Sequence, residues 1–209
     1  MEDVLALYHL PYNPEEPLIC MDETSKQLVG EIKIPIPAAP GQPVRYDYEY
    51  ERHGTSNIFM FAEPLGNWRK VRVTDFRTAV DWAYAMRELL DVDFPDARII
   101  RLVLDNLNTH SPASFYKAFP PEEARRLIKR LEFHYTPKHG SWLNIAEIEL
   151  RVLSVQCLGR RIADKETLTR EVAAWEQPRN DNHDAKVDWQ FSIDNARIKL
   201  KRLYPQLQN

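Results

Sequence analysis

The sequence predicts an α/β protein in which a mixed sheet is flanked by helices. Residues 17–74 contain strand-like segments, including a hairpin, and from residue 78 onward helices alternate with strands. Antiparallel strands followed by strand–helix alternation give a mixed sheet covered by helices. The chain has 209 residues, 44% hydrophobic and 28% charged, which suits one folded domain with an appendage.

The first half of the chain supplies the predicted antiparallel strands. PLICMDETSK is an apolar run that ends in an acid at Asp22. EIKIPIPAAPGQP is extended but is no central strand, because proline cannot donate a ladder hydrogen bond. YDYEYER alternates aromatic and charged residues, which predicts a strand with Tyr46, Tyr48 and Tyr50 in the core. NIFMFAEP and WRKVRVTD, on either side of a turn, predict a hairpin.

The second half has a different periodicity. Apolar residues at helical spacing predict a helix over residues 78–92, with Thr74 or Asp75 as the upstream cap. The nearly continuous apolar run at 98–105 predicts a strand buried on both faces. The segments after it predict short helices at PASFYKAF and EEARRLIKRL, a strand at LEFHY, a long helix at WLNIAEIELRVLSVQCL, and helices at KETLTREVAAWEQ and DNARIKLKRL.

Three regions are expected along the chain: a linker or arm at 1–16, a core at 17–157 and a helical C-terminal extension at 158–209. A net charge of −3 argues against a protein that simply coats nucleic acid. Two widely spaced cysteines and the lack of a membrane-length apolar stretch or signal peptide predict a reduced, cytoplasmic protein with no membrane partner.

Two acids stand at the ends of apolar runs. Asp22 ends the first run, and Asp105 follows Leu102–Leu104 without a basic neighbour. An unpaired buried carboxylate is costly, so each site opens to solvent or meets a cation. If the two strands are neighbours, the acids converge, and oxygen ligands without cysteine favour Mg²⁺ or Mn²⁺. The alternative is a turn or a helix cap, which Asp105-Asn106 followed by Asn108 also suits.

A third ligand is expected from the last helix of the core. Its apolar stripe, which we expect to face the sheet, consists of Leu143, Ala146, Leu150, Leu153 and Cys157. Glu147 and Glu149 flank this stripe on opposite sides. Helical geometry alone does not choose between the two glutamates, and either could be a solvent-facing helix former.

Three blocks, CMDETSK, VLDNLNTH and YTPKHGSWLNIAEIEL, resemble the catalytic core of DDE-superfamily transposases, in particular the bacterial insertion-sequence branch related to the mariner elements. The resemblance runs from about residue 17 to about residue 204. In that family the first acid lies on the first strand, which matches Asp22. The second lies in a strand-ending Asp-Asn followed by a His, which matches Asp105, Asn106 and His110.

The third acid of the family comes three residues after a Leu-Asn pair, in a Pro-rich approach to a helix. Leu143, Asn144 and Glu147 fit this pattern, so the resemblance ranks Glu147 above Glu149. Many relatives have a proline directly after the Leu-Asn pair, whereas this chain has Ile145. Such transposases also usually begin with helix-turn-helix domains, which this sequence does not show. The resemblance therefore implies a separate upstream DNA-binding domain or reading frame.

The resemblance implies an RNase H-like fold in which Asp22, Asp105 and Glu147 are catalytic and hold two Mg²⁺ or Mn²⁺ ions. The implied reaction is hydrolytic cleavage at the ends of a DNA element, followed by attack of the freed 3′-hydroxyl on target DNA. The implied partners are double-stranded DNA and a second copy of the chain. Two alternatives stay open: a structure-selective nuclease on the same fold, and a catalytically silent DNA-binding or assembly module from a decayed transposase.

Several further side chains are candidates for contacting DNA. They are His110, Lys138, Trp142, Arg160, Arg161, Lys199 and Lys201. Each has an ordinary alternative: a core tryptophan, basic residues that complement a helix C-terminus, or a solvated helix face in RIKLKR. His134 and His139 are expected to make ordinary polar contacts.

Overall fold

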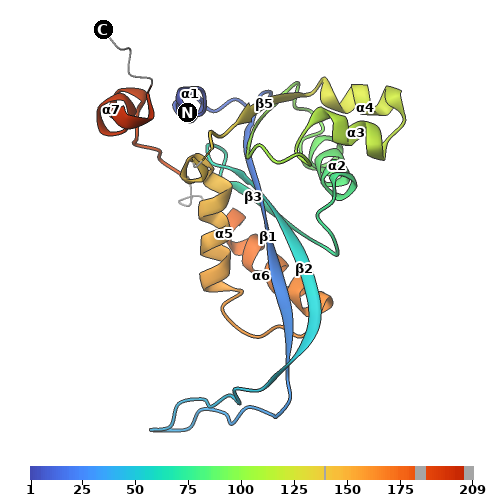
Figure 1. The fold of residues 1–209 in the computed structure, drawn as a ribbon, viewed down its shortest axis with the longest axis vertical. Helices are drawn as coiled ribbons and strands as arrows, with labels where there is room; N and C mark the ends of the chain where they lie inside the picture. Colours follow the sequence, from blue (N-terminus) through green and yellow to red (C-terminus); the bar gives the residue numbers. More distant parts are fainter. Residues whose placement is uncertain (139, 182–186, 205–209) are drawn as a thin grey trace.

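The computed structural model describes residues 1–138, 140–181 and 187–204. Its centre is a five-stranded mixed sheet of strand order β3-β2-β1-β4-β5 (Figure 1). β1 pairs antiparallel with β2, and β2 with β3, whereas β1, β4 and β5 are parallel. The strands are β1 Leu18–Glu31, β2 Tyr50–Glu63, β3 Trp68–Thr74, β4 Ile100–Leu104 and β5 Leu131–Tyr135. The predicted mixed α/β sheet is thereby confirmed.

Helices cover both faces of this sheet. The described helices are α1 Glu2–Tyr8, α2 Ala79–Glu88, α3 Pro112–Ala118, α4 Pro121–Ile128, α5 Ile145–Gln156, α6 Lys165–Asp181 and α7 Ile193–Lys199. One apolar cluster joins α1, α5, α6 and α7 to one sheet face, and a second joins α2, α3 and α4 to the other. No helix of the described residues is long and apolar enough to cross a membrane.

β4 shows why its sequence is apolar at successive positions. Leu102 and Leu104 pack into the cluster on the α2 side, while Val103 packs into the cluster on the α5 side. All three side chains are fully buried, which contributes about 1.5–3 kcal/mol for each. The prediction of a strand buried on both faces is confirmed.

β1 and β2 extend beyond the helical layers as a two-stranded arm, visible at the bottom of Figure 1. The buried apolar run ends at Asp22 and this acid lies on the first strand, as expected, but β1 continues for nine residues past it, so the acid does not leave the strand there. The expectation that Tyr46, Tyr48 and Tyr50 belong to the core was wrong, since all three are exposed. The predicted strand forms only from Tyr50 onward, where β2 begins, so Tyr46 and Tyr48 lie in the segment that joins β1 to β2.

The cap of α2 lies closer to the helix than expected. Thr78, rather than Thr74 or Asp75, is the N-cap, and its hydroxyl accepts a hydrogen bond from the Asp81 amide. The Asp81 carboxylate accepts one in return from the Thr78 amide at 2.8 Å. This reciprocal capping box satisfies two amides that the first helical turn leaves without partners.

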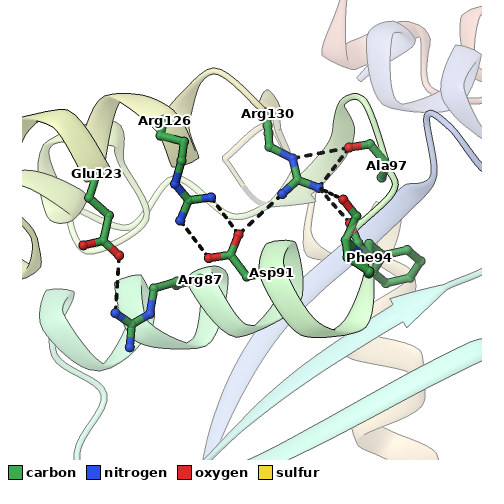
Figure 2. A network of polar contacts seen from close by, with 8 residues as sticks. Arg87, Asp91, Phe94, Ala97, Glu123, Arg126 and Arg130 are labelled. Carbon is green, nitrogen blue, oxygen red and sulfur yellow. Dashed lines mark hydrogen bonds and ion pairs between the residues drawn. The ribbon is translucent and has the colours of Figure 1, made fainter.

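A polar network fastens the π-helical turn after α2, Leu89–Asp93, to α4 (Figure 2). The Asp91 carboxylate accepts two hydrogen bonds from Arg126, at 2.8 and 2.7 Å, which lower its pKa. Arg130 donates to the carbonyls of Phe94 and Ala97, which belong to the loop before β4. These contacts connect the helical layer to the strand that carries the second candidate acid.

Both ends of the described chain join the central core. Residues 2–8, within the expected linker or arm, form α1 because Val4 and Leu5 bury their side chains against the sheet. Trp175 of α6, in the expected C-terminal extension, packs into the same cluster. The division at residues 16 and 157 remains a prediction, and the packed core extends across it on both sides.

Candidate active site

The first two candidate acids lie side by side on neighbouring parallel strands. Cys20 of β1 is paired with Val103 of β4. Following this register for two more residues brings Asp22 opposite Asp105, directly after the end of β4. The two acids therefore meet the condition set by the sequence, namely that their strands are neighbours.

The third candidate acid approaches from α5. Glu147, in the first turn of that helix, lines the same cavity of about 420 Å³ as Asp22 and Asp105. Glu149 points elsewhere: it is buried and forms ion pairs with Arg69 at 3.1 Å and Arg179 at 2.8 Å. The structure thus separates the two glutamates that helical geometry left equivalent. Glu147 faces the cavity, and Glu149 is neutralised in the protein interior.

Negative charge accumulates around Asp22. Burial, which is the largest cause, and the charges of Asp105, Glu23 and Glu147 together raise the pKa of this carboxyl from 3.8 to about 6. A hydrogen bond from the Glu23 amide at 2.8 Å opposes the shift. A site of this kind carries an unfavourable charge density that a cation relieves.

His110 lies beneath the carboxylates, with 1% of its side chain exposed. Its Nδ1 is 2.6 Å from Asp105 and its Nε2 is 2.7 Å from Glu23. Burial lowers the pKa of His110, but the hydrogen bonds and charges of these two acids raise it more, to about 9. His110 is therefore a buried imidazolium. The sequence suggested that His110 contacts DNA, whereas its side chain is buried in the structure.

Glu23 was not among the residues proposed from the sequence. Alternation along β1 places it on the sheet face opposite to Asp22, where it meets His110. Both ring nitrogens of an imidazolium donate hydrogen bonds, so a buried histidine that contacts Asp105 needs a second acceptor. That requirement would have pointed to Glu23.

Asn144 fixes α5 to the sheet. The buried side chain accepts a hydrogen bond from the Ala146 amide at 3.1 Å, which caps the helix, and donates one to the Met21 carbonyl at 2.8 Å. Met21 directly precedes Asp22. One side chain therefore connects the start of the helix that carries Glu147 to the strand that carries Asp22.

The donor set of the cavity fits a hard divalent cation. Asp22, Asp105 and Glu147 offer carboxylate oxygens from three separate elements, without a cysteine nearby among the cavity residues. In the described part of the chain, no three histidine, cysteine or acidic side chains are already gathered around one ion position. One carboxylate oxygen of Asp105 lies 2.6 Å from Nδ1 of His110. The fit therefore rests on ligand chemistry and on shared placement at the cavity.

One candidate DNA-contacting residue lies beside this cavity, and a second lies in the turn before α5. Exposed Lys138 lines a depression that it shares with Asp105. Trp142, 39% exposed, lies in the turn before α5, and its ring is stacked 6.5 Å from that of Trp189.

The other basic candidates belong to different parts of the fold. Arg160 forms an ion pair with Glu171. Arg161 binds Glu31, the last residue of β1, at 2.5 Å, and Lys199 lies over the Phe191 ring.

One basic candidate and two further histidines remain. Lys201 is exposed in the turn after α7. His134 makes polar contacts with Asp3 and Glu132, as expected, and His139 lies outside the described residues.

Residues 17–169 match the family model described as DDE superfamily endonuclease. The match covers well over half of the chain, so the protein belongs to this family. No curated protein matches the chain.

The fold is similar to that of solved Mos1 structures. The Mos1 strand transfer complex matches with a TM-score of 0.57 and 14% identity over 84% of this chain and 51% of that one. The Mos1 mariner paired end complex with Mn matches with a TM-score of 0.56 and 14% identity over 85% and 52%. The Mos1 transposase paired-end complex with left transposon end matches with a TM-score of 0.54 and 14% identity over 78% and 48%.

These likenesses establish that the chain has the RNase H-like fold of the Mos1 catalytic domain. The chain spans about half the length of the Mos1 chains that it matches.

Proposed function

We propose that this chain is the catalytic part of a DNA transposase, which cleaves phosphodiesters at the ends of an element and joins the freed 3′-hydroxyls to target DNA. The observation that carries the proposal is the convergence of Asp22, Asp105 and Glu147, from β1, the end of β4 and α5, on one cavity. Membership of the DDE superfamily endonuclease family supports it.

In this proposal Asp22, Asp105 and Glu147 hold two Mg²⁺ or Mn²⁺ ions. When bound, such ions make an attacking water or hydroxyl more acidic and neutralise charge on the phosphodiester. The protein positions the ligands: Asn144 holds α5 against β1, and His110 holds one oxygen of Asp105. His110 also offsets part of the acidic charge, because its imidazolium lies between Asp105 and Glu23.

We further propose that double-stranded DNA reaches the cavity past Lys138 and Trp142. Lys138 is placed to contact a phosphate, and the exposed part of Trp142 offers a surface for base stacking. The Mos1 structures include complexes with transposon-end DNA, which supports DNA as the partner. His110 is too buried for a direct contact in this arrangement. Arg160, Arg161, Lys199 and Lys201 remain candidates for more distant phosphate contacts.

One further part of the proposal rests on resemblance. A homodimer that holds two DNA ends is expected. Light scattering of the free chain and of its mixture with DNA measures this directly. A chain that stays monomeric on DNA would contradict it.

The first experiment measures melting temperature with and without Mn²⁺, using wild type, Asp22→Asn, Asp105→Asn and Glu147→Gln. A ligand that binds only the native state raises the melting temperature. We expect Mn²⁺ to raise it for wild type and for the control Glu122→Gln, an exposed acid on α4, and for none of the three site variants. Equal stabilisation of all five proteins would refute the proposed site.

The second experiment measures nicking of a supercoiled plasmid and joining of a 3′-hydroxyl oligonucleotide to that plasmid. Metal-dependent nicking and joining, both lost in the three variants, would support a transposase. Nicking without joining would indicate a nuclease. DNA binding that neither requires metal nor changes in Asp105→Asn, without cleavage, would indicate a silent binding module.

A further inference from the structure

Helix α1 contacts β1, which carries Asp22, and the turn that leads into α5, which carries Glu147. Tyr8, its last residue, is buried, and its hydroxyl lies 2.5 Å from the Leu143 carbonyl and 3.3 Å from the Cys20 sulfur. Leu143 directly precedes the N-cap of α5, and Cys20 precedes Asp22 by two residues on β1. Nothing in the transposition chemistry requires a residue at this position.

The direction of the two hydrogen bonds follows from the donors that are available. A tyrosine hydroxyl and a cysteine thiol both ordinarily carry their protons at neutral pH. The Leu143 carbonyl can only accept, so the Tyr8 hydroxyl donates to it. The Cys20 thiol is then left to donate to the Tyr8 oxygen. A continuous chain of two hydrogen bonds runs from β1 through α1 to the approach of α5.

These two hydrogen bonds add a second connection between the elements that carry Asp22 and Glu147. Cys20 and Asp22 are alternate residues of β1, so their side chains share the sheet face that packs against α5. The first connection, from Asn144 to the Met21 carbonyl, acts at the start of the helix. The Tyr8 connection acts one residue earlier, at Leu143. Together they restrain both the turn and the first helical residues that carry Glu147.

The position of α1 is itself fixed from outside the site. Glu2 accepts two hydrogen bonds from Arg197 of α7, both at 2.8 Å, and Asp3 lies 2.7 Å from His134 of β5. The Tyr8 ring packs 5.0 Å from that of Trp189. Figure 1 shows α1 beside α7 at this end of the sheet. Tyr8 is therefore held by contacts that do not pass through α5.

We propose that Tyr8 is a positioning residue of the active site: through the Leu143 carbonyl and the Cys20 thiol it sets where Glu147 lies relative to Asp22. The inference rests on the proposed function, since it assigns the acids to a divalent cation. It makes α1 a structural part of the site, so that displacing this helix loosens the third acid.

The test uses Tyr8→Phe, which removes only the hydroxyl, and measures Mn²⁺ affinity from the electron paramagnetic resonance signal of free Mn²⁺. We expect affinity to fall about 3- to 10-fold, the range that corresponds to losing one hydrogen bond. Nicking should fall at low Mn²⁺ and recover at saturating Mn²⁺. Cys20→Ala removes the other of the two hydrogen bonds and should lower Mn²⁺ affinity by less. This variant still tests the proposal if Tyr8→Phe folds poorly.

The matched control is Trp175→Phe, a change in the same apolar cluster that removes a hydrogen bond to Gln156 at the far end of α5. It should lower the melting temperature without changing Mn²⁺ affinity more than about 2-fold. Wild-type affinity in Tyr8→Phe and Cys20→Ala, alongside weaker binding by Glu147→Gln, would overturn the positioning role and leave the proposed function intact. Equal Mn²⁺ binding by wild type and Glu147→Gln would instead overturn the proposed function, and this inference with it.

Discussion

Asp22→Asn should stabilise the metal-free protein at neutral pH. Burial, with the charges of Asp105, Glu23 and Glu147, raises the pKa of Asp22 from 3.8 to about 6, although the Glu23 amide opposes the shift. A carboxyl whose pKa is higher in the folded than in the unfolded state makes folding less favourable once it ionises. The cost is absent below pH 3.8, grows as the pH rises to about 6 and is constant above that.

The size of the effect follows from the same values. One pKa unit corresponds to about 1.4 kcal/mol, so raising the pKa from 3.8 to about 6 costs at most about 3 kcal/mol at pH 7.5. Because part of the side chain is exposed to solvent, we expect about 1–2 kcal/mol. Asparagine keeps the acceptor for the Glu23 amide. For a chain of this length the melting temperature should rise by about 3–6 °C.

The assay is thermal unfolding in EDTA at pH 7.5 and at pH 4. The control is Asp96→Asn, which removes an exposed carboxylate in the turn before β4 and should leave the melting temperature nearly unchanged. We expect the gain in Asp22→Asn at pH 7.5 and little of it at pH 4. An equal gain at both pH values, or none at pH 7.5, would refute the electrostatic reasoning.

Three further changes test other parts of the structure. Arg69→Met should destabilise the protein by about 3–5 kcal/mol in urea unfolding, because it removes a partner of the buried Glu149 carboxylate, whereas Arg69→Lys should lose less. Asn144→Ala should cost about 1–2 kcal/mol through the lost helix cap, and should weaken Mn²⁺ binding as well. The raised pKa of His110 contributes stability that is complete below pH 6.5 and lost as the pH rises through about 9. Urea unfolding should therefore show a decrease of at most about 3 kcal/mol over that interval, absent in His110→Gln.

The sheet and its helices could be predicted because their signals are local. The apolar run of β4 and the apolar stripe of α5 each occupy consecutive residues, and both elements form as expected. The exposed Tyr46, Tyr48 and Tyr50 show the limit of such signals. Alternation predicted a strand with one covered face, but β2 begins only at Tyr50, and burial depends on contacts with distant segments that alternation does not record.

Predicting the site required contacts between residues that lie far apart in the sequence. Glu147 and Glu149 are equivalent in helical geometry, and the difference between them comes from Arg69 and Arg179, which lie 80 and 30 residues from Glu149. Resemblance to a family ranked Glu147 first, and the structure supplies a physical reason for the ranking. Glu149 already has two cationic partners, whereas Glu147 faces a cavity lined by other acids.

The charges of the site explain why the same residues destabilise the protein and suit it for a cation. Asp22, Glu23, Asp105 and Glu147 line one cavity, and His110 is an imidazolium buried against two of them. His110 offsets the charge of Glu23 and of the Asp105 oxygen that it contacts. The remaining repulsion is concentrated on the cavity side, where burial and neighbouring charge raise the pKa of Asp22. The acids resist separation because their elements are held by β1–β4 pairing, by the Asn144 side chain and by the Tyr8 hydroxyl. In the proposed function, a rigid frame that keeps like charges together favours divalent-cation binding more than flexible carboxylates would, since relaxation would otherwise remove part of the repulsion before an ion could.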